Sequence, residues 1–215
     1  MGLLNKEINL IQKIWSHDEC LKFLKTFSEQ YGKDILYWFN YEQDGRYKSD
    51  IVRLCILFEF GGIYVDVDQE PLISFSEYLD FNKYDFCAAS NMGLHNVSNG
   101  FIYVKKNSNI IKNNIDEMIL RYETNGPIGG CHSLGSTITK LLNIEPLKMP
   151  LGEIKIKNEN CLFLHEIGNT NLQDETQEFY NSFGLYANND KLRVMNSRYD
   201  TYHIDKYKIN EFITI

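Results

Sequence analysis

The stretch SDIVRLCILFEFGGIYVDVDQEPL, residues 49–72, constrains the fold of this chain more than any other part of the sequence. Apolar residues recur at helical spacing over Ser49–Phe60 and cover so much of the surface that this helix is expected to be largely buried. Gly61 is the expected end of the helix. An alternating strand over Ile63–Asp68 follows directly. A buried helix that leads at once into a strand is typical of α/β layer folds.

The expected strand Ile63–Asp68 presents different residues on its two sides, because strand side chains alternate. Its polar side carries Tyr64, Asp66 and Asp68, and its apolar side is expected to pack against the preceding helix. The polar side would then hold two carboxylates about one strand repeat apart near a tyrosine, with Asp68 exposed at the end of the strand. Mg²⁺ and Mn²⁺ prefer carboxylate oxygens, and Mg²⁺ is usually shared with substrate phosphates.

Asp50 and Arg53 lie one turn apart on the expected helix and share a face. A guanidinium there can bind a carboxylate or a phosphate through two parallel hydrogen bonds. Each motif is common by itself, since a D-x-D pair arises easily by chance and an Asp–Arg pair is usually a surface ion pair. Their assembly in the order S-D-x-x-R, G-G-x-Y, D-x-D predicts a site that holds a divalent metal and a sugar-nucleotide diphosphate.

Two other kinds of acidic site fit the residues around Asp66 and Asp68 less well. An EF-hand loop beginning at Asp66 would need glycine at its sixth position for the sharp turn, where Pro71 stands. A hydrolase with Asp66 as nucleophile and Asp68 as acid would make no use of Arg53 or of the paired glycines. The sugar-nucleotide site uses all of these residues and is therefore favoured.

The rest of the chain alternates between strand and helix patterns, which predicts an α/β fold in one domain. Ser16 is the expected cap of a first helix that runs to Tyr31 and stops at Gly32, with Glu19 completing a capping box. A polar turn is expected at Tyr41–Tyr47. Further helices are expected at Ile110–Tyr122 and Ser136–Leu142, and strands at Ile8–Trp15, Ile35–Phe39, Tyr84–Ala89, Phe101–Val104, Glu153–Lys157, Cys161–His165 and Leu192–Met195.

Composition and charge argue against several classes of protein. With 215 residues, of which 43% are hydrophobic, the chain can bury a full core. A net charge of −7 argues against a nucleic-acid partner, which would select a basic surface. No apolar run approaches the ~20 residues that span a bilayer, and the N-terminus lacks the pattern of a signal peptide. The cysteines include no C-x-x-C pair, so we expect reduced thiols in a cytoplasmic protein, with peripheral attachment to a membrane left open.

The segment SDIVRLCILFEFGGIYVDVD resembles the D-x-D sugar-binding region of glycosyltransferases. It is most similar to family thirty-two, which includes yeast-type initiating α-mannosyltransferases and bacterial capsular sugar transferases, and to the glucosyltransferase domains of large clostridial toxins. The positions that match at the family's spacing are Asp50, Arg53, Gly61, Gly62, Tyr64, Asp66 and Asp68. Weaker similarity extends to LIQKIW (Leu10–Trp15), SNGFIYVKKNS (Ser98–Ser108), NGPIGG (Asn125–Gly130) and TYHIDKY (Thr201–Tyr207), although the S-W pair expected after the last of these is absent.

This resemblance implies a GT-A fold, in which a Rossmann-like nucleotide-binding sheet flanked by helices is joined to a small acceptor-side region. Residues 1–215 would form one glycosyltransferase domain, with the nucleotide-sugar and metal-binding part in about 1–105 and the acceptor-side part and C-terminal segment in about 106–215.

The reaction implied by the resemblance moves a sugar from a nucleotide-sugar donor to a glycan or other hydroxyl acceptor, as in polysaccharide biosynthesis. UDP-hexose is favoured over GDP-mannose as donor, and retention of configuration is expected. The alternative is a catalytically weak or inactive domain that binds sugar nucleotides or has a regulatory role. The short chain and the absent S-W pair keep that alternative open.

The resemblance also implies how a cation would be held. Asp68 would coordinate Mn²⁺ or Mg²⁺ directly, and Asp66 would contact both the sugar or ribose and the water around the cation. A neutral imidazole can supply a further ligand. His203 is the candidate for it because it matches the family's single histidine, and His165 is its rival.

The remaining roles implied by the resemblance concern the donor. Asp50 and Arg53 would hold the hydroxyls and the diphosphate side of the donor sugar, and Asn99 would bind a further hydroxyl. Tyr64 would line the ribose or phosphate. Trp15 would lie against the base, where stacking on an aromatic ring is worth ~1–3 kcal/mol, with a place in the core as its alternative.

Overall fold

A computed structural model describes residues 11–66, 68–91, 96–126, 130–145, 148–167, 184–187, 190–197 and 211–214, with the backbone alone for 131, 197 and 211–214. Its helices are α1 (His17–Tyr31), α2 (Ile35–Tyr41), α3 (Gly45–Phe60), α4 (Asn109–Glu123) and α5 (Gly130–Leu142), with a 3₁₀ turn at Phe75–Glu77. Its strands are β1 (Gln12–Trp15), β2 (Gly62–Val65), β3 (Gln69–Pro71), β4 (Phe86–Asn91), β5 (Asn96–Val104), β6 (Gly152–Ile156), β7 (Glu159–Ile167), β8 (Gly184–Ala187), β9 (Leu192–Ser197) and β10 (Glu211–Thr214). The expected α/β class is confirmed.

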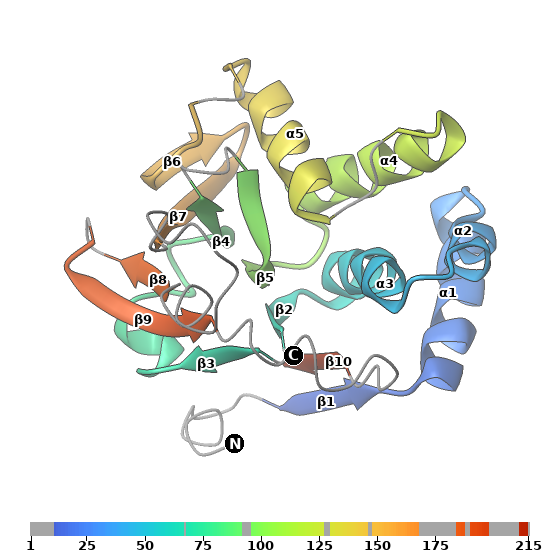
Figure 1. The fold of residues 1–215 in the computed structure, drawn as a ribbon, viewed down its shortest axis with the longest axis horizontal. Coiled ribbons are helices and arrows are strands. Elements are labelled where there is room, and N and C mark those ends of the chain that lie inside the picture. The colour runs from blue at the N-terminus through green and yellow to red at the C-terminus, as the bar shows by residue number, and fades with distance from the viewer. Residues whose placement is uncertain are drawn as a thin grey trace, which may run out of the picture.

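The strands of the described residues form one sheet in the order β1-β10-β2-β5-β4-β7-β8-β9-β3, with β6 paired to β7. The pair β4–β7 is parallel and the other pairs are antiparallel. β2 and β3 are consecutive in the chain, yet β3 stands at the far end of the pairing order. The short link 66–68 therefore requires the sheet to curve back on itself, and Figure 1 shows β3 near β2.

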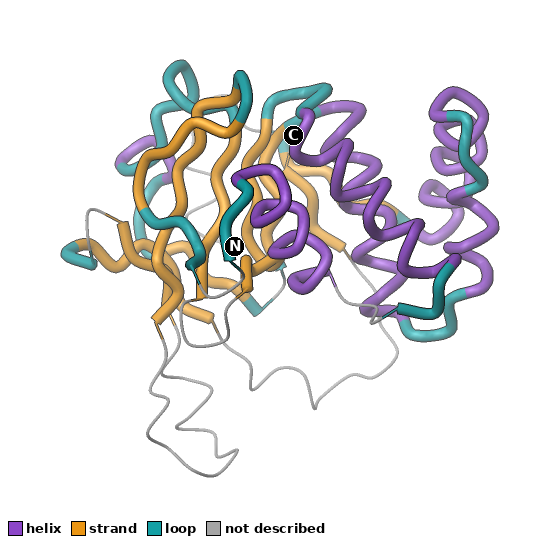
Figure 2. Tube along the Cα trace, turned by 90° about the horizontal axis from the view of Figure 1, so that it is seen from above, coloured by secondary structure: helices purple, strands orange, loops and turns teal. Residues whose placement is uncertain are grey.

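The helices cover one face of the sheet, and Figure 2 shows most of them on one side of the strands. The core on that face joins α3 and α4 to β5, through residues such as Leu54, Ile115 and Ile102. The curved sheet encloses a second core on its other face, with Ile63 and Val65 of β2 among its members. The sheet is thus buried on both faces. A side chain of β2 therefore packs either against the helices or into the second core, depending on the face to which it points.

The boundaries of the first and third helices follow their caps. Ser16 and Glu19 form the expected capping box of α1, and the chain leaves that helix at Gly32. The third helix begins earlier than expected, at Gly45, because the Asp44 side chain accepts a hydrogen bond from a backbone N–H of the first turn. The polar turn expected at Tyr41–Tyr47 is therefore largely taken up by the end of α2 and the start of α3. The other elements expected from the sequence are present with displaced ends, except the one at Ile35–Phe39.

The prediction of a strand at Ile35–Phe39 was wrong, because these residues form α2. The Asp34 carboxylate caps this helix by accepting a hydrogen bond from Tyr37 N at 3.0 Å. Trp38 stacks on Tyr122 of α4, with ring centroids 5.3 Å apart. Aromatic residues favour strands in general, but here their packing against neighbouring helices decides the structure.

The strand predicted at Ile63–Asp68 ends at Val65, and a turn follows in which Gln69 N donates to Asp66 O at 3.0 Å. Ile63 and Val65 belong to the second core, whereas Tyr64 faces the helices. The expectation that the apolar side packs against the preceding helix was therefore wrong. In the part of the chain that the structure describes, no helix is long and apolar enough to cross a membrane.

Candidate functional site

Asp50 of α3 joins three elements through its carboxylate. Asn99 Nδ2 of β5 donates to Oδ1 at 2.6 Å, and the backbone N–H of Gly130 at the start of α5 donates to Oδ2 at 2.8 Å. The guanidinium of Arg53 lies 3.3 Å from Oδ1, so the pair expected on one helix face is formed. Burial raises the pKa of Asp50, although Arg53 and these hydrogen bonds oppose the rise. Asp50 therefore links α3 to β5 and to α5.

Arg53 is enclosed by protein groups, with a side chain only 5% exposed. Its Nη1 donates to Asn99 O and its Nη2 to Ser49 Oγ, each at 2.7 Å. The guanidinium lies over the ring of Tyr64, 4.1 Å from the centroid, and Nη1 is 3.5 Å from Asp66 Oδ1. The cation thus stands between the carboxylate of its own helix and the first carboxylate of the D-x-D motif.

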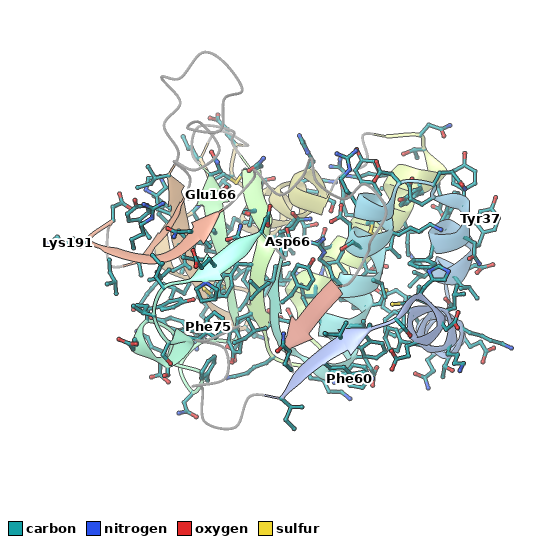
Figure 3. The ribbon with its side chains drawn as sticks, turned by 60° about the horizontal axis from the view of Figure 1, so that its bottom comes forward. Tyr37, Phe60, Asp66, Phe75, Glu166 and Lys191 are labelled. Carbon is teal, nitrogen blue, oxygen red and sulfur yellow. The ribbon has the colours of Figure 1, made fainter. Side chains whose placement is uncertain are left out.

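Asp66 lies on the helix side of the sheet. The hydroxyl of Tyr64 donates to its Oδ1, and its backbone N–H donates to Gly100 O of β5 at 2.7 Å. A Cβ on Gly100 would lie 2.9 Å from Asp66 Oδ2, so the carboxylate needs a glycine there. Figure 3 shows Asp66 between the strands and the helices.

Asp68 is buried, at 5% exposure, where the sequence predicted an exposed carboxylate at a strand end. Burial first, and then the charge of Asp66, raise its pKa to about 7. Its Oδ1 is buried and has no hydrogen-bond partner among the residues that the structure describes. Buried carboxylate oxygens are normally bonded, so this oxygen is suited to bind a cation, and Mn²⁺ and Mg²⁺ prefer oxygen ligands.

The described residues contain no group of three Asp, Glu, His or Cys side chains placed to hold a metal by themselves. A cation at Asp68 would therefore need ligands from the donor phosphates or from water, which is usual for Mg²⁺. His203, the predicted further ligand, lies outside the described residues. Its rival His165 pairs through Nδ1 with Asp190 at 2.8 Å.

Trp15, at the end of β1, is a buried ring in this structure. It packs edge-on against Phe23 at 5.4 Å and lies 6.1 Å from Phe60, with Lys13 Nζ 3.8 Å above the ring. Its buried Nε1 has no hydrogen-bond partner within the described ranges. β10 separates β1 from β2, so Trp15 is not part of the group that surrounds Arg53.

The structure thus brings most of the predicted donor site together around one guanidinium: Asp50, Arg53, Tyr64, Asp66 and Asn99. Sequence reasoning missed Ser49 and the two glycines at positions 100 and 130. A Cβ on Gly130 would lie 1.9 Å from Asn99 Nδ2. The NGPIGG turn was visible in the sequence, but nothing there tells which backbone N–H meets Asp50.

Residues 4–85 match a protein-family model described as "Glycosyltransferase sugar-binding region containing DXD motif". That range includes Asp50, Arg53, Tyr64, Asp66 and Asp68. The match confirms the prediction of a D-x-D sugar-binding region like that of glycosyltransferases over these residues. The DXD family generally binds a divalent metal, and a sugar-binding region of this kind indicates a nucleotide-sugar donor.

The other comparisons add less. No curated protein matches the chain significantly. Among solved structures, the chain is similar to a protein described as "PaToxG Glycosyltransferase", with 23% sequence identity and a TM-score of 0.39 over 59% of this chain. The match spans 44% of that protein, so the chain covers less than half of its length. The more specific relations to family thirty-two and to the toxins stay predictions.

Proposed function

We propose that this chain is a metal-dependent glycosyltransferase with a GT-A fold. It would move a sugar from a nucleotide-sugar donor, UDP-hexose in preference to GDP-mannose, to a glycan or other hydroxyl acceptor with retention of configuration. About 1–105 would form the part that binds donor and metal, and about 106–215 the acceptor side. Support comes from the family match over residues 4–85 and from the polar network at the end of β2.

The observation that carries this proposal is the buried Asp68 oxygen, which has no partner in the described part of the chain and lies just after the strand of the matched motif. The carboxylates of Asp50, Asp66 and Asp68 are set against the guanidinium of Arg53. A diphosphate is itself anionic and would be repelled by that excess of negative charge. A divalent cation offsets the negative charge of both the site and the diphosphate, so donor binding should depend on the cation.

Asp68 would bind the cation directly, with Asp66 beside it at the sugar or ribose. When bound, Mn²⁺ or Mg²⁺ supplies charge stabilisation for the nucleoside diphosphate as it departs. Arg53 would orient the Asp66 carboxylate and add positive charge near the leaving group, because the Tyr64 ring and the Asn99 carbonyl fix its position. His203 stays a proposed further ligand.

Retention is consistent with attack by the acceptor on the face from which the diphosphate leaves. The acceptor oxygen would form the new bond to the anomeric carbon as that carbon loses its bond to the phosphate oxygen. The acceptor proton would pass to the departing diphosphate. Such a route needs donor and acceptor to be positioned side by side, and positioning alone can supply several kcal/mol of the barrier.

Calorimetry with UDP-glucose and with GDP-mannose, each with and without Mn²⁺, tests the donor and the metal together. We expect Mn²⁺-dependent binding of UDP-glucose, lost in Asp68→Asn, and slow release of glucose when no acceptor is present. Binding that does not change with Mn²⁺ would overturn the proposal. Metal-dependent binding without hydrolysis or transfer would instead identify the binding-only domain.

A further inference from the structure

Ser49 lies in the buried part of α3, and its oxygen atoms face the guanidinium of Arg53. The residue is 7% exposed. Arg53 donates to it twice, from Nη2 to Ser49 Oγ at 2.7 Å and from Nε to Ser49 O at 3.4 Å. Ser49 is four residues before Arg53, so the two side chains share one face of the helix. A single residue therefore holds two of the three nitrogens of the guanidinium.

The Ser49 hydroxyl also reaches the strand that follows α3. Its Oγ lies 3.5 Å from the hydroxyl oxygen of Tyr64, a side chain that is 2% exposed. The Tyr64 hydroxyl donates to Asp66 Oδ1, and Arg53 Nη1 lies 3.5 Å from that same oxygen. These contacts close a circuit of four side chains, which we call the polar ring: Ser49, Arg53, Tyr64 and Asp66. The polar ring joins α3 to β2 and to the turn after β2.

The chemistry of the four side chains fixes the direction of these hydrogen bonds. A guanidinium can only donate, so Ser49 Oγ is the acceptor from Arg53. An ionised carboxylate can only accept, so the one proton of the Tyr64 hydroxyl is committed to Asp66. The Ser49 proton is therefore the one that serves the contact between Ser49 and Tyr64. Hydrogen bonds that run in one direction through a buried chain of groups polarise and strengthen one another.

The polar ring engages one particular oxygen of the Asp66 carboxylate. Tyr64 and Arg53 both meet Oδ1, whereas Oδ2 lies over Gly100, where an added Cβ would stand 2.9 Å from it. The Asp66 side chain is 22% exposed, so a ligand can reach the carboxylate. An ionised carboxylate oxygen accepts hydrogen bonds, and the hydroxyls of a nucleotide sugar can supply them.

We propose that Ser49 is a positioning residue for the donor site. Its hydroxyl holds the Arg53 guanidinium in place and directs the Tyr64 proton to Oδ1 of Asp66. Oδ2 of Asp66 is thereby left to accept from a hydroxyl of the nucleotide sugar. The inference deepens the proposed function and rests on it, because it assumes that the matched motif binds such a donor. Ser49 acts through Arg53 and Asp66 and does not itself touch the donor.

Two substitutions of nearly equal shape separate the hydroxyl of Ser49 from the volume of its side chain. Ser49→Thr keeps the hydroxyl, and Ser49→Val has a methyl group in its place. Both side chains are β-branched, so they burden the helix alike. The Kd of UDP-glucose in the presence of Mn²⁺ is measured by calorimetry on the full chain. It should rise about 10–100-fold in Ser49→Val, as for other residues that orient a ligand-binding group, and stay within about threefold in Ser49→Thr.

Ser90→Ala is the matched control. Ser90 is a fully buried serine of β4 outside the polar ring, so the Kd of UDP-glucose should not change. If Ser49→Thr and Ser49→Val do not fold, Ser49→Ala removes the hydroxyl without adding volume, and its Kd is compared with that of the unaltered protein. GDP-mannose replaces UDP-glucose as the probe if only GDP-mannose binds.

A double-mutant cycle with Tyr64→Phe gives a readout that a merely structural serine would not produce. Tyr64→Phe opens the polar ring at the residue after Ser49 and keeps the aromatic ring on which Arg53 lies. Once the polar ring is open, Ser49→Val should raise the Kd by a factor at least about threefold smaller than it does alone. A serine that only packs within α3 would give the same factor in both backgrounds.

The outcomes separate this inference from the proposed function. Equal Kd values for Ser49→Val and Ser49→Thr, or for Ser49→Ala and the unaltered protein where that variant is used, would overturn the role of Ser49 and leave the proposed function intact. Equal factors in the two backgrounds of the cycle would do the same. Failure of the unaltered protein to bind UDP-glucose or GDP-mannose with Mn²⁺ would overturn both.

Discussion

A methyl group at Gly130 is expected to disrupt the candidate site from a position outside the D-x-D motif. Its Cβ would lie 1.9 Å from Asn99 Nδ2 and 2.6 Å from Asp50 Oδ1. The Asn99 amide must move, and its 2.6 Å hydrogen bond to Asp50 breaks. Losing a hydrogen bond to a buried charge costs about 1.5–3 kcal/mol, and overpacking adds about 1–3 kcal/mol.

Partial relaxation leaves an expected destabilisation of about 2–4 kcal/mol for Gly130→Ala. For a domain of this size that corresponds to a fall of roughly 5–15 °C in melting temperature. Gly135→Ala in the same helix is the control, because its Cβ would meet atoms no closer than 3.4 Å. Alanine is also the better helix former, so this control should melt at the same temperature or slightly higher.

A double-mutant cycle makes the reasoning refutable. In an Asn99→Ala background the nearest obstacle is gone, so Gly130→Ala should cost clearly less than it does alone. The same variants should be titrated with UDP-glucose and Mn²⁺. If Gly130→Ala melts within about 2 °C of the unaltered protein and binds donor equally well, the contact between α5 and Asp50 is wrong.

Arg53→Lys keeps the charge but loses the planar guanidinium that donates to Ser49. Donor hydrolysis, assayed well below the melting temperature, should therefore fall about 10²-fold. Hydrolysis within a few-fold of the unaltered protein would make Arg53 a structural ion-pair partner. Burial raises the pKa of Glu117, but Lys140 and Arg121 outweigh it and lower the pKa. The stabilisation is therefore present above the unfolded pKa and lost as pH falls through the folded one, so Glu117→Gln should cost about 1–2 kcal/mol at pH 7 and less at pH 3 in urea titrations. Ser16→Ala removes the cap of α1 and should cost about 1 kcal/mol in the same assay.

Local signals in the sequence predicted the elements whose ends are set by short-range contacts. The first helix runs between its capping box and Gly32 because both signals act within a few residues. Gly61 ends α3 through its positive φ of 71°, which favours glycine, and its N–H still bonds to Leu57 O. The strand predicted at Ile35–Phe39 failed for the opposite reason, since the stacking of Trp38 on Tyr122 joins residues far apart in the sequence.

The sequence predicted the part of the site that one helix and one strand supply. It did not predict the surroundings that depend on how the other strands are paired. Asp50 and Arg53 could be paired from helical spacing alone. The period-two pattern placed Asp66 and Asp68 on one face, but a turn begins after Val65, so the pattern no longer applies to them.

That turn has a consequence for the chemistry of the motif. A strand that continued through Asp68 would direct both carboxylates to the helix side, where Arg53 neutralises them. The turn instead leaves Asp66 with Arg53 and sends the chain on to β3, so that Asp68 is buried with an oxygen that no donor of the described residues reaches. The second core, which Val65 joins just before this turn, is assembled by pairings from β2 through β5 and β4 to β7, together with the curvature that closes the sheet. Such pairings join residues distant in sequence, and their register is set by the whole sheet. That Asp66 faces Arg53 while Asp68 is buried away from it could therefore be established only from the fold.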